Sequence, residues 1–118
     1  MGTTLYKTYN IPKDCTITLT VTIGYGQKGD TQVYLDGKTL CQYTDTFTHN
    51  IPNKGSELDN KILFCSTIVA DIQKGTNETS VIYELSGGVN TYKQILQESV
   101  DSDGDVKFYV AYFNFRVV

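Results

Sequence analysis

An acidic turn near the C-terminus is the part of the sequence that most resembles a metal-binding motif. Residues Asp101-Ser102-Asp103-Gly104-Asp105 place carboxylates at positions 1, 3 and 5, as a calcium-binding loop does. An EF-hand loop also needs Gly at position 6 and Glu at position 12, where this chain has Val106 and Tyr112. The pattern therefore favours an acidic hairpin turn, and a weak calcium site shared with neighbouring loops is the alternative.

A glycine-rich segment, Gly24-Tyr25-Gly26-Gln27-Lys28-Gly29, matches the GxGxxG pattern of dinucleotide-binding loops. In those proteins a helix begins at the loop, because the N-terminus of the helix holds the pyrophosphate. Here the next residues, DTQVYLDGKTL, have the character of a β-hairpin. We therefore predict no cofactor, and we interpret the segment as a flexible loop in which Tyr25 and Gln27 are candidate contact residues.

Groups that could serve catalysis or bind zinc are scarce in this chain. His49 is the only histidine, and no serine or cysteine stands in a recognisable nucleophile motif. Cys15, Cys41 and Cys65 are too widely spaced for the close ligand pairs that structural zinc sites use. We therefore predict that the protein is not an enzyme, that it has no metal site, and that its cysteines are reduced and packed as small apolar residues.

The composition argues against several classes of partner and location. Ten Lys and Arg residues against thirteen Asp and Glu residues give a net charge of -3, and no three basic residues are consecutive. Nucleic-acid binding is therefore not expected. No apolar stretch approaches the roughly 20 residues that span a bilayer, so no membrane partner is expected either. The absence of a visible signal peptide and the odd cysteine count predict a cytoplasmic protein.

The elements that must position these residues are β-strands. Residues 15–23, CTITLTVTI, alternate apolar and threonine side chains without a break, which is typical of a half-buried antiparallel strand. Thr91–Val100 fits a helix or a strand, and the strand is favoured because a turn follows it. Asp36-Gly37 predicts a tight hairpin turn, and the two prolines are expected to end strands. The other predicted strands are Thr4–Tyr9, Thr31–Leu35, Lys38–Tyr43, Thr44–Ile51, Lys61–Ile72, Thr79–Leu85 and Val106–Val117.

About seven to nine strands with frequent turn signals predict an all-β fold. We expect a single-domain antiparallel β-sandwich over residues 1–118, immunoglobulin-like or jelly-roll-like. The predicted strands Lys61–Ile72 and Val106–Val117 are apolar on both faces. A lone sandwich buries one face of each sheet, so strands of this kind indicate a covering partner or strand exchange.

The sequence therefore predicts a non-catalytic protein-interaction or self-assembly module, whose partner is another protein or a second copy of the chain. Nine tyrosines support this prediction, because a tyrosine ring buries area while its hydroxyl keeps a hydrogen bond. The alternative is a carbohydrate- or small-ligand-binding module, with or without calcium. The segment Met1–Tyr9 is expected to be available for pairing with the edge of a neighbour's sheet. The candidate contact residues lie in two loops and are Tyr25, Gln27, Asp101, Asp103 and Asp105.

Overall fold

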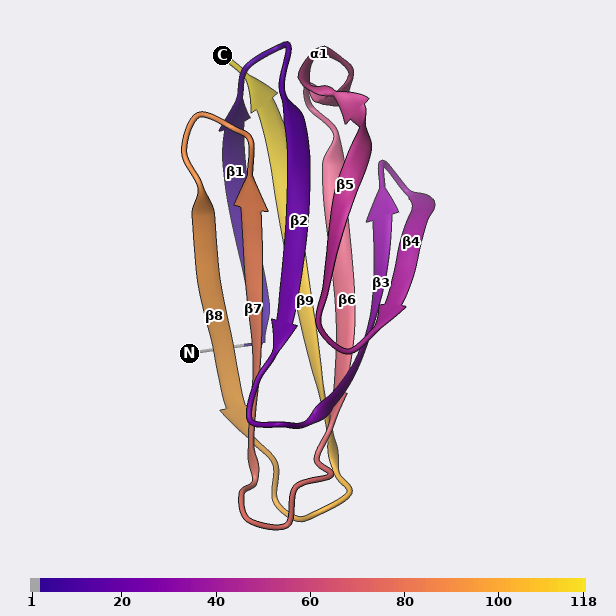
Figure 1. Ribbon diagram of the computed structural model, residues 1–118, viewed down its shortest axis with the longest axis vertical. Helices are drawn as coiled ribbons and strands as arrows, with labels where there is room; N and C mark the ends of the chain where they lie inside the picture. Colours follow the sequence, from indigo (N-terminus) through magenta and orange to yellow (C-terminus); the bar gives the residue numbers. More distant parts are fainter. Residues whose placement is uncertain (1–2) are drawn as a thin grey trace.

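Two β-sheets pack face to face in the computed structural model, which describes residues 3–118 (Figure 1). Sheet A has the strand order β1-β9-β6-β3-β4, and sheet B has the order β5-β2-β7-β8. The strands of sheet A are β1 (Thr4–Ile11), β3 (Lys28–Leu35), β4 (Lys38–Thr44), β6 (Ile62–Ala70) and β9 (Val106–Val117). The strands of sheet B are β2 (Thr16–Ile23), β5 (Phe47–Lys54), β7 (Glu78–Ser86) and β8 (Tyr92–Ser99). The predicted all-β sandwich is therefore confirmed.

The pairing of the strands is antiparallel except at the N-terminus, where β1 runs parallel to β9. This pairing corrects the expectation that Met1–Tyr9 is free to join a neighbour's sheet. Residues Thr4–Ile11 already form an edge strand of their own sheet, with Tyr6 opposite Tyr112. Met1 and Gly2 lie outside the described residues.

Several boundaries differ from those expected from the sequence, and each difference has a local reason. β5 continues through Pro52 to Lys54, because β5 is an edge strand of sheet B, where proline is tolerated. The polar segment after it contains a short helix, α1 (Gly55–Leu58), whose Glu57 carboxylate accepts a 3.0 Å bond from the Lys54 backbone N–H. The ambiguous segment after the β7–β8 turn is a strand, as favoured.

One apolar core fills the space between the sheets. Every strand contributes side chains to it, those of β4 being only partly buried, because successive residues of a strand point to opposite faces. Burying a large apolar side chain contributes about 1.5–3 kcal/mol, so this core supplies the main driving force for folding. Its largest fully buried members include Ile11, Ile17, Leu19, Ile51, Leu58, Leu63, Leu85, Phe113 and Phe115.

Two buried tyrosine hydroxyls connect the sheets through this core. The Tyr83 hydroxyl on β7 lies 2.7 Å from Thr67 Oγ1 on β6, which lies 3.0 Å from Thr31 Oγ1 on β3. The Tyr109 hydroxyl on β9 lies 2.6 Å from Thr79 Oγ1 on β7. A buried hydroxyl left without a partner would cost about 1–3 kcal/mol, so these pairs specify how the two inner faces meet.

Removal of the Tyr83 hydroxyl should make the fold less sensitive to alkali. Burial raises the pKa of this phenol above its ordinary value of 10.0, so the folded state holds the proton more tightly than the unfolded state. The associated stability is complete below pH 10.0 and is lost as the pH rises further. We expect Tyr83→Phe to lower the free energy of unfolding at neutral pH by about 1 kcal/mol, and to lose less stability than the wild type on going to alkaline pH.

Urea unfolding between about pH 7 and pH 11 measures both effects. Burial also raises the pKa values of Tyr109 and Cys65, so the variant keeps part of the alkaline loss. An identical pH dependence in the wild type and Tyr83→Phe would contradict this assignment.

Candidate functional site

The loops that carry the predicted contact residues meet at one end of the sandwich, which is the lower end in Figure 1. These loops are residues 24–27, 71–77 and 100–105. Backbone hydrogen bonds join them: the Asp71 N–H donates to the Asp105 carbonyl and the Gly104 N–H to the Asp71 carbonyl, each at 2.9 Å. The Val100 N–H donates to the Asn77 carbonyl at 2.8 Å. The structure therefore brings the acidic turn against the β6–β7 loop.

Gln27 is buried, contrary to the exposed position expected for a contact residue. Its side chain is only 5% exposed, because β3 begins at the next residue and the glycine-rich loop is short. Its Nε2 donates to Asp71 Oδ1 at 2.8 Å and to the Glu78 carbonyl at 3.0 Å. Its Oε1 accepts the N–H groups of Ile72 at 2.8 Å and Gln73 at 3.0 Å. The amide therefore donates two and accepts two hydrogen bonds, which is all that it can form. These bonds hold the end of β6 and the start of β7 together, and we call this arrangement the Gln27 clamp.

Tyr25 is exposed, as the loop prediction implies, but its hydroxyl is already engaged. The residue has a φ of 57°, a left-handed conformation that is uncommon outside glycine. Its ring is 45% exposed, and its hydroxyl accepts a 2.7 Å hydrogen bond from Gln97 Nε2 on β8. The side chain is therefore held toward sheet B.

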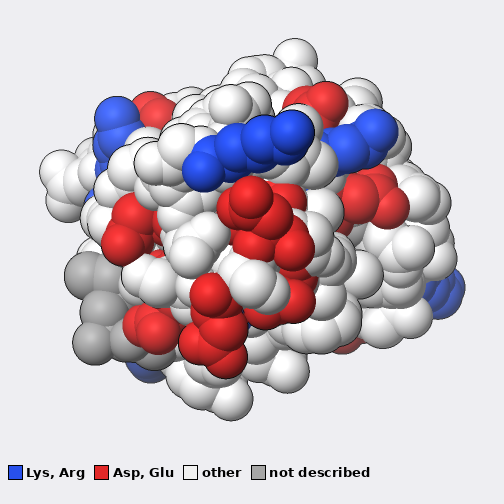
Figure 2. Space-filling model, turned by 90° about the horizontal axis from the view of Figure 1, so that it is seen from below, with Lys and Arg blue, Asp and Glu red and all other residues white. Residues whose placement is uncertain are grey.

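The predicted acidic residues Asp101, Asp103 and Asp105 are exposed, and Figure 2 shows Asp and Glu side chains gathered on this end of the molecule. The Asp105 carboxylate accepts hydrogen bonds from the N–H and the hydroxyl of Ser102, both at 3.2 Å. Gly104 adopts a φ of 87°. These are the local bonds and left-handed glycine of a turn. Within residues 3–118, no group of three or more His, Cys, Asp or Glu side chains is arranged to hold a metal ion.

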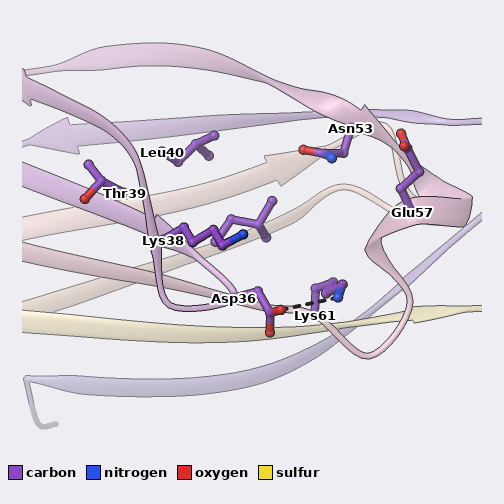
Figure 3. A pocket seen from close by; sticks show the side chains of 8 residues that line it. Asp36, Lys38, Thr39, Leu40, Asn53, Glu57 and Lys61 are labelled. Atoms are coloured by element: carbon purple, nitrogen blue, oxygen red, sulfur yellow. Dashed lines mark hydrogen bonds and ion pairs between the residues drawn. The ribbon is translucent and has the colours of Figure 1, made fainter.

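A second candidate is a cleft of about 290 Å³ between the β3–β4 hairpin and the β5–α1 segment (Figure 3). Leu40 contributes apolar surface, while Asp36, Lys38, Glu57 and Lys61 contribute charges of both signs. Lys61 Nζ lies 3.3 Å from Asp36 Oδ2, an exposed pair that contributes about 1 kcal/mol or less. Because the lining carries charges of both signs, it favours neither an anionic nor a cationic ligand. The cleft is therefore a weak candidate for a binding site.

The third candidate is the outer face of sheet A, where the two central strands point apolar side chains into solvent. Phe108 is 60% exposed, and Ile68 lies opposite it on β6. At the outward positions of β6 and β9, the only charged side chain is Arg116, at the end of β9. We call this surface the apolar face, and its members are Ile62, Phe64, Ile68, Val106, Phe108, Val110 and Tyr112 with Tyr6 and Tyr34 at its sides.

Four aromatic rings form a row across the apolar face, from β1 to β3. The ring centroids of Tyr6 and Tyr112 are 4.8 Å apart with an interplanar angle of 5°. Those of Tyr112 and Phe64 are 4.8 Å apart, and those of Phe64 and Tyr34 are 5.9 Å apart. The interplanar angle is 32° for Tyr112 and Phe64 and 26° for Phe64 and Tyr34, so the rings stack closely at the Tyr6–Tyr112 pair and are tilted along the rest of the row.

The sequence identified the two-faced strands but missed the members of this row on β1 and β3. Tyr6 and Tyr34 join the row only because Tyr6 lies opposite Tyr112 and Tyr34 lies opposite Phe64. Those pairs connect segments far apart in the chain, so they follow from the strand order of sheet A. The sequence alone could show only that Tyr6 and Tyr34 each stand at a position of their strand that points away from the core.

The outer face of sheet B is polar by comparison. β2 presents a column of threonines there, Thr16, Thr18, Thr20 and Thr22, as the alternating sequence predicted. The exposed apolar exception on β8 is Ile95. The two outer faces of the sandwich therefore differ sharply in chemistry.

Comparisons with protein-family models, with curated proteins and with solved structures find no significant match. Over residues 3–118, no helix has the length and apolar character needed to cross a membrane. The geometry of the chain itself carries the functional proposal.

The Gln27 clamp predicts a large stability effect from a single substitution. Gln27→Leu removes four hydrogen bonds and leaves the N–H groups of Ile72 and Gln73 without this partner. We expect the free energy of unfolding to fall by about 2–4 kcal/mol in urea titrations. Gln42→Leu, at an exposed position of edge strand β4, is the matched control and should change stability by about 0.5 kcal/mol or less. Equal effects of the two substitutions would rule out the clamp.

Proposed function

We propose that this chain is a non-catalytic protein-interaction module that binds its partner through the apolar face. The observation that carries the proposal is an unbroken line of outward apolar side chains along β9, from Val106 through Phe108 and Val110 to Tyr112, in which Phe108 is 60% exposed. Soluble monomers rarely expose contiguous apolar patches larger than a few hundred Å², and larger patches commonly mark interaction sites.

The fold itself does not need this surface to be apolar. The core between the sheets is complete without it, since the apolar face points away from that core. Sheet B shows that a polar outer face is compatible with the same sandwich, because its central strand β2 presents threonines to solvent. Apolar side chains concentrated on one of the two outer faces are therefore better explained by binding than by folding.

The histidine and the three cysteines, which are the side chains best suited to catalysis in this chain, do not support an enzymatic function. The His49 ring bonds the Tyr43 hydroxyl through Nδ1 at 2.8 Å, on the side of the sandwich near the β4–β5 turn. Burial raises the pKa values of the thiols of Cys15, Cys41 and Cys65. Thiols with raised pKa values are protonated at neutral pH and are poor nucleophiles.

The alternative function, a carbohydrate- or small-ligand-binding module, has weaker support. Sugars and small aromatic ligands stack on exposed ring faces, whereas the two inner rings of the row, Tyr112 and Phe64, each have a neighbouring ring on both sides. The cleft beside Leu40 carries charges of both signs. The carboxylate of Asp105 in the acidic turn is hydrogen-bonded to Ser102 in its own turn. A protein partner fits the apolar face better.

We further propose that the domain resides in a reducing compartment such as the cytoplasm. All three thiols are free, and Cys41 and Cys65 lie opposite the same residue of β3, Val33, from its two sides. Two strand spacings put their Cα atoms roughly 9–10 Å apart, beyond the reach of a disulfide.

Thiol labelling checks the proposed compartment. Denaturing alkylation of the protein immediately after lysis of its own cells should add three mass tags, one for each cysteine. Fewer than three tags would contradict a reducing location.

A site-specific crosslink tests the proposed interaction surface. With p-benzoylphenylalanine in place of Phe108, illumination of cells that produce the chain should yield a covalent adduct with another polypeptide. The same group in place of Ile95, which is 38% exposed on the outer face of sheet B, is the matched control and should give none. Adducts at both positions, or at neither, would count against the apolar face as the binding surface.

A further inference from the structure

We infer that the polypeptide covering the apolar face is a second copy of this chain, packed face to face across a twofold axis. The inference rests on the proposed function and names its partner. Two such copies would bury the rows of Tyr6, Tyr112 and Phe64 against each other, with the inner cores of both sandwiches unchanged.

The size of the face meets the requirement of a stable dimer. The outer surface that contains it runs along the nine residues of β6 and across the four strands β1, β9, β6 and β3, and this surface includes Gln32 and Ser66 as well as the charged Lys28 and Asp30. With the usual strand dimensions this is about 30 Å by 19 Å, or roughly 570 Å² of flat sheet per copy. Two copies would therefore bury about 1,100 Å² in total, without counting the additional area of side chains that project from the sheet. This total is above the roughly 1,000 Å² expected of a specific interface.

The charge distribution also suits a self-association. Across a twofold axis each patch meets an identical patch, so a central charge would face its own copy and repel it. At the outward positions of β1, β3, β6 and β9, the charged side chains are Asp30 in the row of Phe108, Lys28 in the next row, and Arg116 at the opposite end. The rows that contain Val110 and Tyr112 carry no charge and can pack against themselves.

The edges of sheet A are less suited to pairing copies than its face is. The upper part of the β1 edge is covered by the β7–β8 turn, where the Val89 N–H donates to the Asn10 carbonyl at 3.0 Å. Lys7 Nζ lies 5.0 Å from the Tyr92 ring centroid and covers the same side. The β4 edge is a seven-residue strand with the polar residues Lys38 and Gln42 on it. Short and polar edges of this kind discourage strand addition.

Phe108 is the side chain on which the interface depends most. It is among the most exposed of the large apolar residues, and it lies beside Ile68 in the row that continues to Asp30 on β3. Aromatic side chains that become buried in an interface commonly dominate its affinity. Phe108→Lys would also bring two lysines into the contact, one from each copy, so we expect the dissociation constant of the dimer to rise by about 100-fold or more.

Sedimentation equilibrium of the purified full-length chain, over about 1–300 µM, tests the inference. The wild type should approach twice the chain mass of 13.2 kDa at the higher concentrations, whereas Phe108→Lys should remain a monomer. Ile95→Lys, on sheet B, should dimerise like the wild type. Circular dichroism confirms that each variant is folded. If Phe108→Lys does not fold, Tyr6→Lys replaces it, because Tyr6 is 73% exposed on another strand of the same face.

A wild-type chain that stays monomeric throughout, or a dimer that persists in the folded face variant, overturns the inference. The crosslink at position 108 separates this failure from failure of the proposed function. An adduct with a different polypeptide would keep the apolar face as a binding surface and replace the second copy by that protein. Absence of any adduct together with a monomer would overturn both.

Discussion

The surface chemistry of this sandwich depends on the hydroxyl pairs buried between its sheets. β9 is apolar on both sides over much of its length, and a slip of one residue would exchange Phe108, Val110 and Tyr112 for the inward set of Tyr109, Ala111 and Phe113. Near the end of the strand the same slip would bring Asn114 or Arg116 inward in place of the buried Phe115, so hydrophobic burial selects the register there. The bond between Tyr109 and Thr79 selects it nearer the start of the strand, since a slip would separate these two hydroxyls. The bond from Tyr83 to Thr67 acts in the same way on β6.

Fixing the inner face of a strand also fixes its outer face. Because Thr67 and Tyr109 must point inward, Ile68 and Phe108 must point outward and lie opposite each other on the solvent side. The stacked rings then follow from strand order, since the register of β1 and β3 with these strands aligns Tyr6 and Tyr34 with the same row. The exposed apolar surface is thus a defined feature of the fold, with a hollow of about 330 Å³ beside Tyr6, Ile62 and Tyr112.

The parts that could be predicted from the sequence are those that depend on neighbouring residues. The alternation in residues 15–23 located β2, and Asp36-Gly37 located the β3–β4 turn, because strand phase and turn chemistry are local. Gln27 was misjudged because its partners Asp71 and Glu78 are 44 and 51 residues away, and only the meeting of three loops buries it. Pro52 was expected to end a strand, since a sequence does not show that β5 is an edge.

Sandwich proteins commonly bind through the loops at their ends, where side chains are free to vary. In this chain several polar groups of the loop end are committed to internal bonds, while the side chains of Asp101 and Asp103 stay exposed. Gln27 is fully used by the β6–β7 loop, the Tyr25 hydroxyl is bound by Gln97, and the Asp105 carboxylate is bound by Ser102. The apolar face, by contrast, consists largely of aromatic and aliphatic side chains, and of its hydroxyls that of Tyr34 bonds Gln32 Oε1. Such a surface suits the proposed protein partner, because a folded protein can offer an extended apolar surface of its own.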